Sequence, residues 1–506
     1  MRLLEIRRLL PEMTPPTNSA QNSVGVNVAP SSVAAVFPEF VRKAKSPKEQ
    51  LLIGITTAAV FLGTWFVPFN GDRTARHALA VGLFMIISWM TELMPHAVTG
   101  LIGCYLFWAL KVVRFDVAFS GFVQETTWFY MGVLLFGMMA SETGLARRLA
   151  VYLLMRVGSS YSKILLGLIV LSFLLTFIVP SGVACVVIQA SVVIGLLRAF
   201  GYGPGTNVAR GMFITLTYTA GLFDKMLIAG AASILGRGLI VKFTGKPIYW
   251  SQWFLAYLPL SIATILILWR FVLWLYPPEE RVMKGGAEYF AQERREIGPW
   301  TSLEKRAVVL MGCGLALWMT DFVHHVSPAI IGIGVGLLGL VPGIGVLQFD
   351  VAKAKLNYMS IFFVGSALSL GAVLSESKAL GVLTGVLFSW MAPLMTNKFM
   401  VVMVPYWAAL GYHLFLGNEL SMLSTSMPAL IHFAQVNNFD PVALGMVWTF
   451  ASGGKIFVYQ SAVMIVGYSY GYFDARDMLR VGSFLCIVES LLLLIVFNLW
   501  WPRLGI

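Results

Sequence analysis

The triplet Pro180-Ser181-Gly182 interrupts an apolar run that extends over residues 164–197. A second long apolar run, residues 400–433, is interrupted by Gly417-Asn418-Glu419, and the two interruptions start 237 residues apart, at 180 and 417. Two flanking pairs repeat with an offset of 234: Ser141-Glu142 and Gly211-Met212 recur as Ser375-Glu376 and Gly445-Met446. An internal repeat in apolar sequence indicates a carrier made of two copies of one membrane unit, with its substrate site between the copies.

The composition also indicates a membrane protein. Hydrophobic residues make up 58% of the chain and charged residues 12%, whereas charged residues make up about 25% of a soluble domain. The mean hydropathy is +0.79. The net charge of +12 comes from basic residues that lie between apolar runs, where they act as topology signals rather than as a nucleic-acid surface. The four cysteines show no metal-ligand spacing and are expected in the core. We therefore expect an all-α polytopic membrane protein.

The lengths of the apolar runs predict the architecture. A spanning helix needs about 17 to 25 apolar residues, and the sequence has about eleven such runs. Residues 164–197 and 400–433 are too long for one span and are broken at the centre, so each is expected to form a re-entrant hairpin enclosed by protein or by a water-filled cavity. The two tips are expected to approach each other near the membrane midplane.

Four segments follow from this pattern. They are a cytoplasmic N-terminal tail (1–50), a first repeat (51–276), a cytoplasmic connection (277–303) and a second repeat (304–506). Basic residues around the first hairpin and in the connection place both on the cytoplasmic side, whereas the second hairpin opens to the other side. The repeats are thus inverted, and the protein is expected in the cell inner (plasma) membrane.

Three short motifs, in order, resemble a known family. They are Trp89-Met90-Thr91-Glu92-Leu93-Met94-Pro95, which is similar to a W-x-T-E-x-x-P segment, Glu142-Thr143-Gly144-Leu145-Ala146, and Gly471-Tyr472-Phe473-Asp474-Ala475-Arg476-Asp477-Met478-Leu479. With both hairpins they resemble, over residues 51–501, the divalent anion:sodium symporters that carry dicarboxylates, citrate or sulfate. The resemblance implies a homodimeric carrier whose transport domain moves against a scaffold domain like an elevator.

The hairpin tips keep part of the family pattern. In the family each tip bears Ser-Asn-Thr, which binds a substrate carboxylate and helps to hold sodium; here only Ser181 and Asn418 match. Independently of the family, a helix N-terminus attracts anions, and serine and asparagine are good N-caps. We expect Ser181, Gly182, Asn418 and Glu419 to contact the substrate. The alternative is that Ser181 and Asn418 only cap the turns. The altered tips argue against sodium coupling, and sodium is kept only as an open alternative.

Two charged residues follow the first hairpin. Asp224 and Lys225 lie in Thr217-Tyr218-Thr219-Ala220-Gly221-Leu222-Phe223-Asp224-Lys225, where the family has an unwound, glycine-rich stretch that shapes a sodium site. A charge at the bilayer centre costs at least about 2.5 to 3.5 kcal/mol, so such residues are functional candidates. Adjacent helical residues point about 100° apart, so the two cannot pair unless the helix is broken. Thr219, Gly221 and Asp224 are candidates for coupling. The alternative is a lysine that reaches the interface and an aspartate in a structural ion pair.

Lys455 holds the matching place in the second repeat. It follows Ser452-Gly453-Gly454 and precedes Ser461, which matches a family threonine in a second unwound stretch. We expect Lys225, Lys455 and Ser461 to bind the substrate, with lysine charge replacing at least one sodium ion. Glu419 would then balance a lysine in the empty site or take up a proton. A purely structural Glu-Lys pair is the alternative.

These observations predict a secondary active transporter for a small divalent anion, a dicarboxylate first and sulfate or a related oxyanion next, working by exchange or proton coupling. The alternatives are a sodium-coupled symporter with altered sodium sites, a non-transporting sensor and an intramembrane enzyme. The apolar runs contain no HExxH, GxSxG or acidic metal-binding cluster, which argues against the enzyme. The expected partners are the anion, membrane lipid and a second copy of the chain, without cofactor or nucleic acid.

Overall fold

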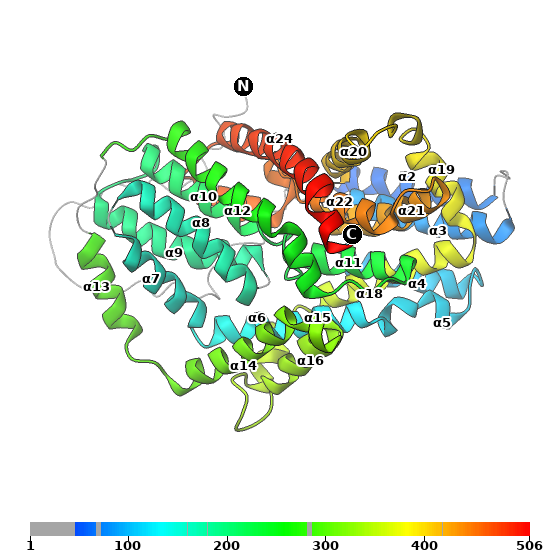
Figure 1. Ribbon diagram of the computed structural model, residues 1–506. Helices are drawn as coiled ribbons and strands as arrows, with labels where there is room; N and C mark the ends of the chain where they lie inside the picture. Colours follow the sequence, from blue (N-terminus) through cyan, green and yellow to red (C-terminus); the bar gives the residue numbers. More distant parts are fainter. Residues whose placement is uncertain (1–45, 67–71, 159, 180, 281–285, 417) are drawn as a thin grey trace. The chain divides into compact units, whose positions relative to one another are not determined.

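The structure, a computed structural model, describes residues 46–66, 72–158, 160–179, 181–280, 286–416 and 418–506. Most of the expected N-terminal tail, together with Pro180 and Gly417 of the two tips, lies outside these residues. The described chain consists of helices and the loops that join them (Figure 1). The protein is all-helical, as the sequence predicts.

The described helices recur in the same order in the two halves. After α2 (Pro47–Phe66), the first half contains α3 (Arg73–Met90), α4 (His96–Ala109), α5 (Phe115–Ala118), η2 (Ser120–Val123), α6 (Glu125–Glu142), α7 (Leu145–Val157), α8 (Tyr161–Ile178), α9 (Gly182–Phe200), α10 (Asn207–Leu222), α11 (Ala231–Thr244) and α12 (Trp250–Leu275). Helix α13 (Gly286–Ile297) lies in the connection. The second half contains α14 (Ser302–Met319), α15 (Asp321–His324), α16 (Pro328–Leu338), α17 (Phe349–Lys355), α18 (Tyr358–Glu376), α19 (Ala379–Phe388), η3 (Ala392–Leu394), α20 (Met400–Leu416), α21 (Glu419–Val436), α22 (Pro441–Ser452), η4 (Val458–Gln460), α23 (Ala462–Ser469), α24 (Ala475–Leu499) and η5 (Trp501–Leu504).

Helices of one half pack against non-equivalent helices of the other. Helix α6 packs on α16, and α18 packs on α4, which forms one group of helices. In a second group, α9 packs on α10 and α23, whereas α21 packs on α22 and α11. Helices α12 and α24 also contact each other, and α10 touches both (Figure 1). This reciprocal exchange brings the loops that follow α10 and α22 together.

Six described helices are long and apolar enough to cross a membrane: α2, α8, α9, α12, α18 and α24. The bent pair α6 and α7, with an angle of 62° between its helices, would be a seventh. Five apolar helices are shorter, at 10–17 residues: α4, α16, α19, α20 and α22. The expected number of about eleven spans therefore stays a prediction.

Both predicted hairpins consist of two helices with a short break between them. Helices α8 and α9 meet at residues 179–181, and α20 and α21 meet at residues 417–418; the partners of each pair contact each other. Because α8 and α9 are each long enough for a span, re-entry of the first hairpin also stays a prediction.

The connection between the halves is fixed to the first half by Arg148 of α7. Its guanidinium is paired with Glu304 at the start of α14, with 2.6 Å between Nε and Oε1, and the two side chains are 2% and 5% exposed. The same guanidinium donates to the carbonyl oxygens of Ile297, Gly298 and Pro299 at 3.0 to 3.2 Å. Glu304 also forms a capping box with Thr301. A planar group with five donors is suited to satisfy this set of acceptors.

The adjacent residues Arg147 and Arg148 allow a test of the contact between Arg148 and the connection, which we call the anchor. We expect Arg148→Ala to lower the free energy of unfolding by about 3 to 5 kcal/mol, because it leaves Glu304 buried without its partner. Arg147, whose side chain is 51% exposed and pairs with Glu293, is the matched control, and its replacement by alanine should cost about 1 kcal/mol or less. Thermal unfolding of the purified variants in detergent measures both. Equal losses in stability would contradict the anchor.

Candidate functional site

Three helix starts lie near the two loops brought together by the exchange. Ser181 caps α9 and accepts from Ala184 N at 3.3 Å, and Asn418 caps α21 and accepts from Leu420 N and Ser421 N at 2.9 and 3.3 Å. Ser461 caps α23 and accepts from Val463 N at 3.2 Å. All three are therefore N-caps, and their oxygens are used on the first turns of their own helices.

The helix after the first hairpin is broken where the sequence predicts. Helix α10 ends at Leu222 and α11 starts at Ala231, so Asp224 and Lys225 lie in the turns between them. We name residues 223–230 the first break. The second break, residues 453–461, separates α22 from α23 and contains Lys455.

The side chain of each lysine extends from its own break toward the other break. The Nζ of Lys455 donates to the carbonyl oxygen of Gly221 at 3.3 Å, at the end of α10. The side chain of Lys225 passes Gly453 so closely that a Cβ there would overlap its Cδ. Gly453 is therefore required for the passage of this lysine. Lys225 also lies over the ring of Phe450, with 4.3 Å from Nζ to the ring centroid.

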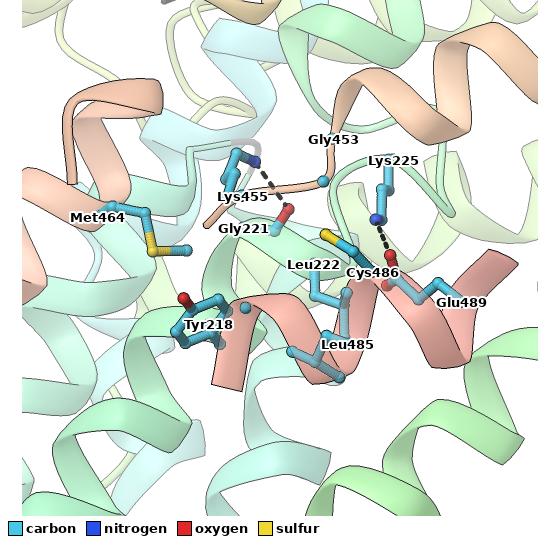
Figure 2. Close-up of a pocket in the computed structure, with 12 residues that line it drawn as sticks. Tyr218, Gly221, Leu222, Lys225, Gly453, Lys455, Met464, Leu485, Cys486 and Glu489 are labelled. Atoms are coloured by element: carbon cyan, nitrogen blue, oxygen red, sulfur yellow. Dashed lines mark hydrogen bonds and ion pairs between the residues drawn. The ribbon is translucent and has the colours of Figure 1, made fainter. Parts of the chain in front are cut away.

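Both lysines have carboxylate partners. The Nζ of Lys225 is 2.6 Å from Oε2 of Glu489 on α24, and the two side chains are 2% and 1% exposed. The Nζ of Lys455 is 3.4 Å from Oε2 of Glu419, with side chains 6% and 17% exposed. Figure 2 shows the first pair and the contact of Lys455 with Gly221. In this geometry Glu419 balances the charge of Lys455, and Glu489 balances the charge of Lys225.

The side chain of Asp224 lies beside the start of α9, the second helix of the first hairpin. A Cβ at Gly182 would lie 3.0 Å from its Oδ2, and the backbone carbonyl of Asp224 accepts from Ser233 Oγ at 2.9 Å. Its Oδ1 has no hydrogen-bond partner among the described residues. The same hypothetical Cβ would lie 2.7 Å from Val463, so the starts of α9 and α23 adjoin. A carboxylate at a helix N-terminus is favourable.

The charged groups surround a small cavity. Its lining includes Gly221, Lys225, Gly453, Lys455 and Glu489 (Figure 2), and its volume of about 10 Å³ leaves room for about one water molecule. A dicarboxylate therefore needs movement of the surrounding side chains to enter.

The structure brings most of the predicted residues to this site but not all of them. Gly221, Lys225 and Lys455 line the cavity; Glu419, Asp224 and Gly182 adjoin the lysines or the first break. Thr219 instead faces Ser172 between α8 and α10, with 2.6 Å between the hydroxyl oxygens. The side chains of three further predicted residues are N-caps of helices: Ser181, Asn418 and Ser461. The approach of the two tips near the membrane midplane stays a prediction.

Two residues that matter here were missed as site residues. Glu489 lies outside the predicted site, although a carboxylate within the apolar part of α24 is itself a signal of function. His413 of α20 is fully buried, and its two ring nitrogens face the carbonyl oxygens of Gly454 and Gln460 at 3.1 and 3.2 Å. These contacts join α20 to the second break. Among the described residues, no group of three or more His, Cys, Asp or Glu side chains is arranged to hold a metal ion.

The comparison with known proteins identifies the family. Residues 48–506 match the model of the sodium:sulfate symporter transmembrane region. The chain belongs to this family. It is therefore an integral membrane protein of a transporter family, which confirms the resemblance seen in the motifs.

Individual relatives are distant but cover most of the chain. A membrane protein of Cupriavidus necator is 26% identical over 485 residues, which cover 91% of this chain and 94% of the relative. An L-tartrate/succinate antiporter of Escherichia coli K12 is 25% identical and covers 76% of this chain and 80% of the antiporter. Dicarboxylate transporter 1, chloroplastic, of Spinacia oleracea is 24% identical and covers 90% and 81%.

The buried Lys225–Glu489 pair can be tested by a double-mutant cycle. Lys225→Met leaves Glu489 buried without a cation, and we expect the free energy of unfolding to fall by about 3 to 5 kcal/mol. Glu489→Gln in addition removes the unpaired charge and should restore much of this loss. Thermal unfolding in detergent measures Lys225→Met, Glu489→Gln and the double variant against the wild type. A double variant no more stable than Lys225→Met would show that the pair does not exist in the membrane-extracted protein.

Proposed function

We propose that this protein carries small dicarboxylates across the inner membrane by sodium-independent exchange. The family and the names of its relatives support a divalent anion as solute, since the two named relatives are a tartrate/succinate antiporter and a dicarboxylate transporter. A dicarboxylate is favoured over sulfate by these names and by the presence of two separate ammonium groups.

The contact between Lys455 and Gly221 carries the proposal. The family resemblance puts a sodium site at the unwound stretch that ends α10. Here an ammonium group from the other repeat donates to a carbonyl oxygen of that stretch. Because the chain supplies this positive charge itself, the charge need not be bound from solution.

The anion site combines helix starts and ammonium groups. The N-terminal N–H groups of α9, α21 and α23 favour negative charge, and Lys225 and Lys455 lie at the two breaks beside them. A di-anion with two separated carboxylates can engage both lysines. Ser181, Asn418 and Ser461 act by holding the helix starts, and Gly182 allows close approach at the first tip.

Transport requires the closed site to open to each side of the membrane in turn. The group of helices formed by α4, α6, α16 and α18 would act as the scaffold, and the group that contains α8–α10 and α20–α24 would act as the moving domain. This elevator arrangement, with a second copy of the chain at the scaffold, is part of the proposal.

Counterflow in proteoliposomes tests the function. Vesicles loaded with succinate should accumulate labelled succinate, and sodium added outside should change the rate by less than about twofold, which corresponds to less than about 0.4 kcal/mol of coupling. Vesicles loaded with tartrate, citrate or sulfate in place of succinate show which of these anions the protein also exchanges. Lys225→Met should lower exchange at every sodium concentration.

Uptake that rises steeply with external sodium, both in the wild type and in Lys225→Met, would contradict sodium independence. Binding of succinate by purified protein without any exchange would instead favour the non-transporting sensor.

The helix starts can be tested by replacing their caps. Asn418→Leu and Ser181→Leu should each lower exchange by at least about fivefold, because an N-cap contributes about 1 kcal/mol or more and its loss moves the N–H groups that face the anion. Ser191 lies on the exposed face of α9 and is the matched control for leucine substitution. Exchange in both tip variants equal to that of Ser191→Leu would show that the site has been placed wrongly.

A further inference from the structure

The protein's own carboxylates occupy the positions that an anion would take. Glu489 is paired with Lys225, Glu419 is paired with Lys455, and Asp224 lies at the start of α9. A substrate that binds the same cations must displace the two glutamates from them.

The charges do not balance if the glutamates stay ionised. The two lysines and three carboxylates give a net charge of −1, and an added di-anion would bring it to −3. Excess negative charge is costly in a buried site of low dielectric constant. Binding of the di-anion therefore requires the uptake of positive charge.

We propose that Glu489 and Glu419 each take up one proton when a di-anion binds, so that two protons move with each dicarboxylate. This inference rests on the proposed function and deepens it. The protons come from the water on the side to which the site is open, and each binds to one glutamate oxygen. Two lysine–glutamate ion pairs are broken and two lysine–substrate ion pairs are formed. The net charge of the site stays the same, and transport of the di-anion with its protons is electroneutral.

The geometry of Glu489 supports its role. The side chain is 1% exposed, one oxygen is bound to Lys225, and the other oxygen, Oε1, has no hydrogen-bond partner among the described residues. An ionised carboxylate with an unsatisfied buried oxygen is costly, and protonation removes that charge. Once neutral, Glu489 no longer holds Lys225, and the ammonium is available to the substrate.

Glu419 and Asp224 differ in whether they form an ion pair. Glu419 starts α21 and contacts both Lys455 and Ser452 Oγ, at 3.4 Å each. Asp224 forms no ion pair within the part of the chain that the structure describes. An exchange of partners at the lysines therefore breaks the ion pairs of the two glutamates and breaks none at Asp224.

Other titratable groups face the site from the helices around it. They are Tyr218 of α10, Tyr257 of α12, Tyr406 and His413 of α20, and Cys486 of α24. Of these, the imidazole of His413 is the one whose ordinary pKa lies near neutral pH. His413→Gln therefore serves as the competing variant in the test.

Proton uptake appears in the pH dependence of binding. Succinate binding to purified protein is measured by calorimetry between about pH 7 and pH 8.5, where linkage makes the slope of log Kd against pH equal to the number of protons taken up. We expect a slope of about 2 for the wild type and about 1 for Glu489→Gln and for Glu419→Gln. Glu142→Gln, which removes a glutamate of the exposed pair with Lys355, should keep the wild-type slope.

Transport gives the second readout. Counterflow of succinate in proteoliposomes, with the same pH on both sides, should become faster as the pH is lowered and should not respond to membrane potential, whereas Glu489→Gln should weaken this pH response. A wild-type slope near zero, or a slope reduced by His413→Gln and unchanged by Glu489→Gln, would overturn the inference. If counterflow itself is absent from the wild type, the proposed function fails; if counterflow is present and the slope is zero, only this inference fails.

Discussion

Compensation of two buried lysine charges is the constraint on which the site depends. An ammonium group in a low-dielectric interior needs a counter-charge or strong hydrogen-bond acceptors nearby. Each lysine is paired with a glutamate, and Lys455 also donates to a backbone carbonyl. The broken helices, the glycines beside the lysines and the carboxylate of α24 all serve this arrangement.

The exchange of helices between the two halves explains why the charges meet. Helix α23 packs on α9 and α10, while α11 packs on α21 and α22, so each break lies beside a hairpin of the other half. A lysine at a break is then within reach of the opposite break. The same packing places helix N-termini around the charges, and these favour an anion at the site.

The sequence predicts much of this site because the signals are local. Gly-Gly before Lys455 and the charged pair Asp224-Lys225 mark the breaks within a few residues, and Ser181 and Asn418 are capping residues whose role follows from type and position. The pairing of Lys225 with Glu489 is different, because the two residues are 264 positions apart and meet only through packing of α24 beside the first break. Thr219 is a further case: its hydroxyl contacts Ser172 between α8 and α10, and its role in coupling stays a prediction. The number of spans is also hard to predict, since several apolar helices are shorter than a span.

The central claim is that both lysines bind the substrate's carboxylates in place of the protein's own. A structure of the protein with bound succinate, determined in lipid nanodiscs without sodium, tests it most directly. The account predicts a carboxylate within about 4 Å of Nζ of both Lys225 and Lys455, with Glu489 no longer paired with Lys225. Succinate bound elsewhere, with the Lys225–Glu489 pair intact, would contradict it.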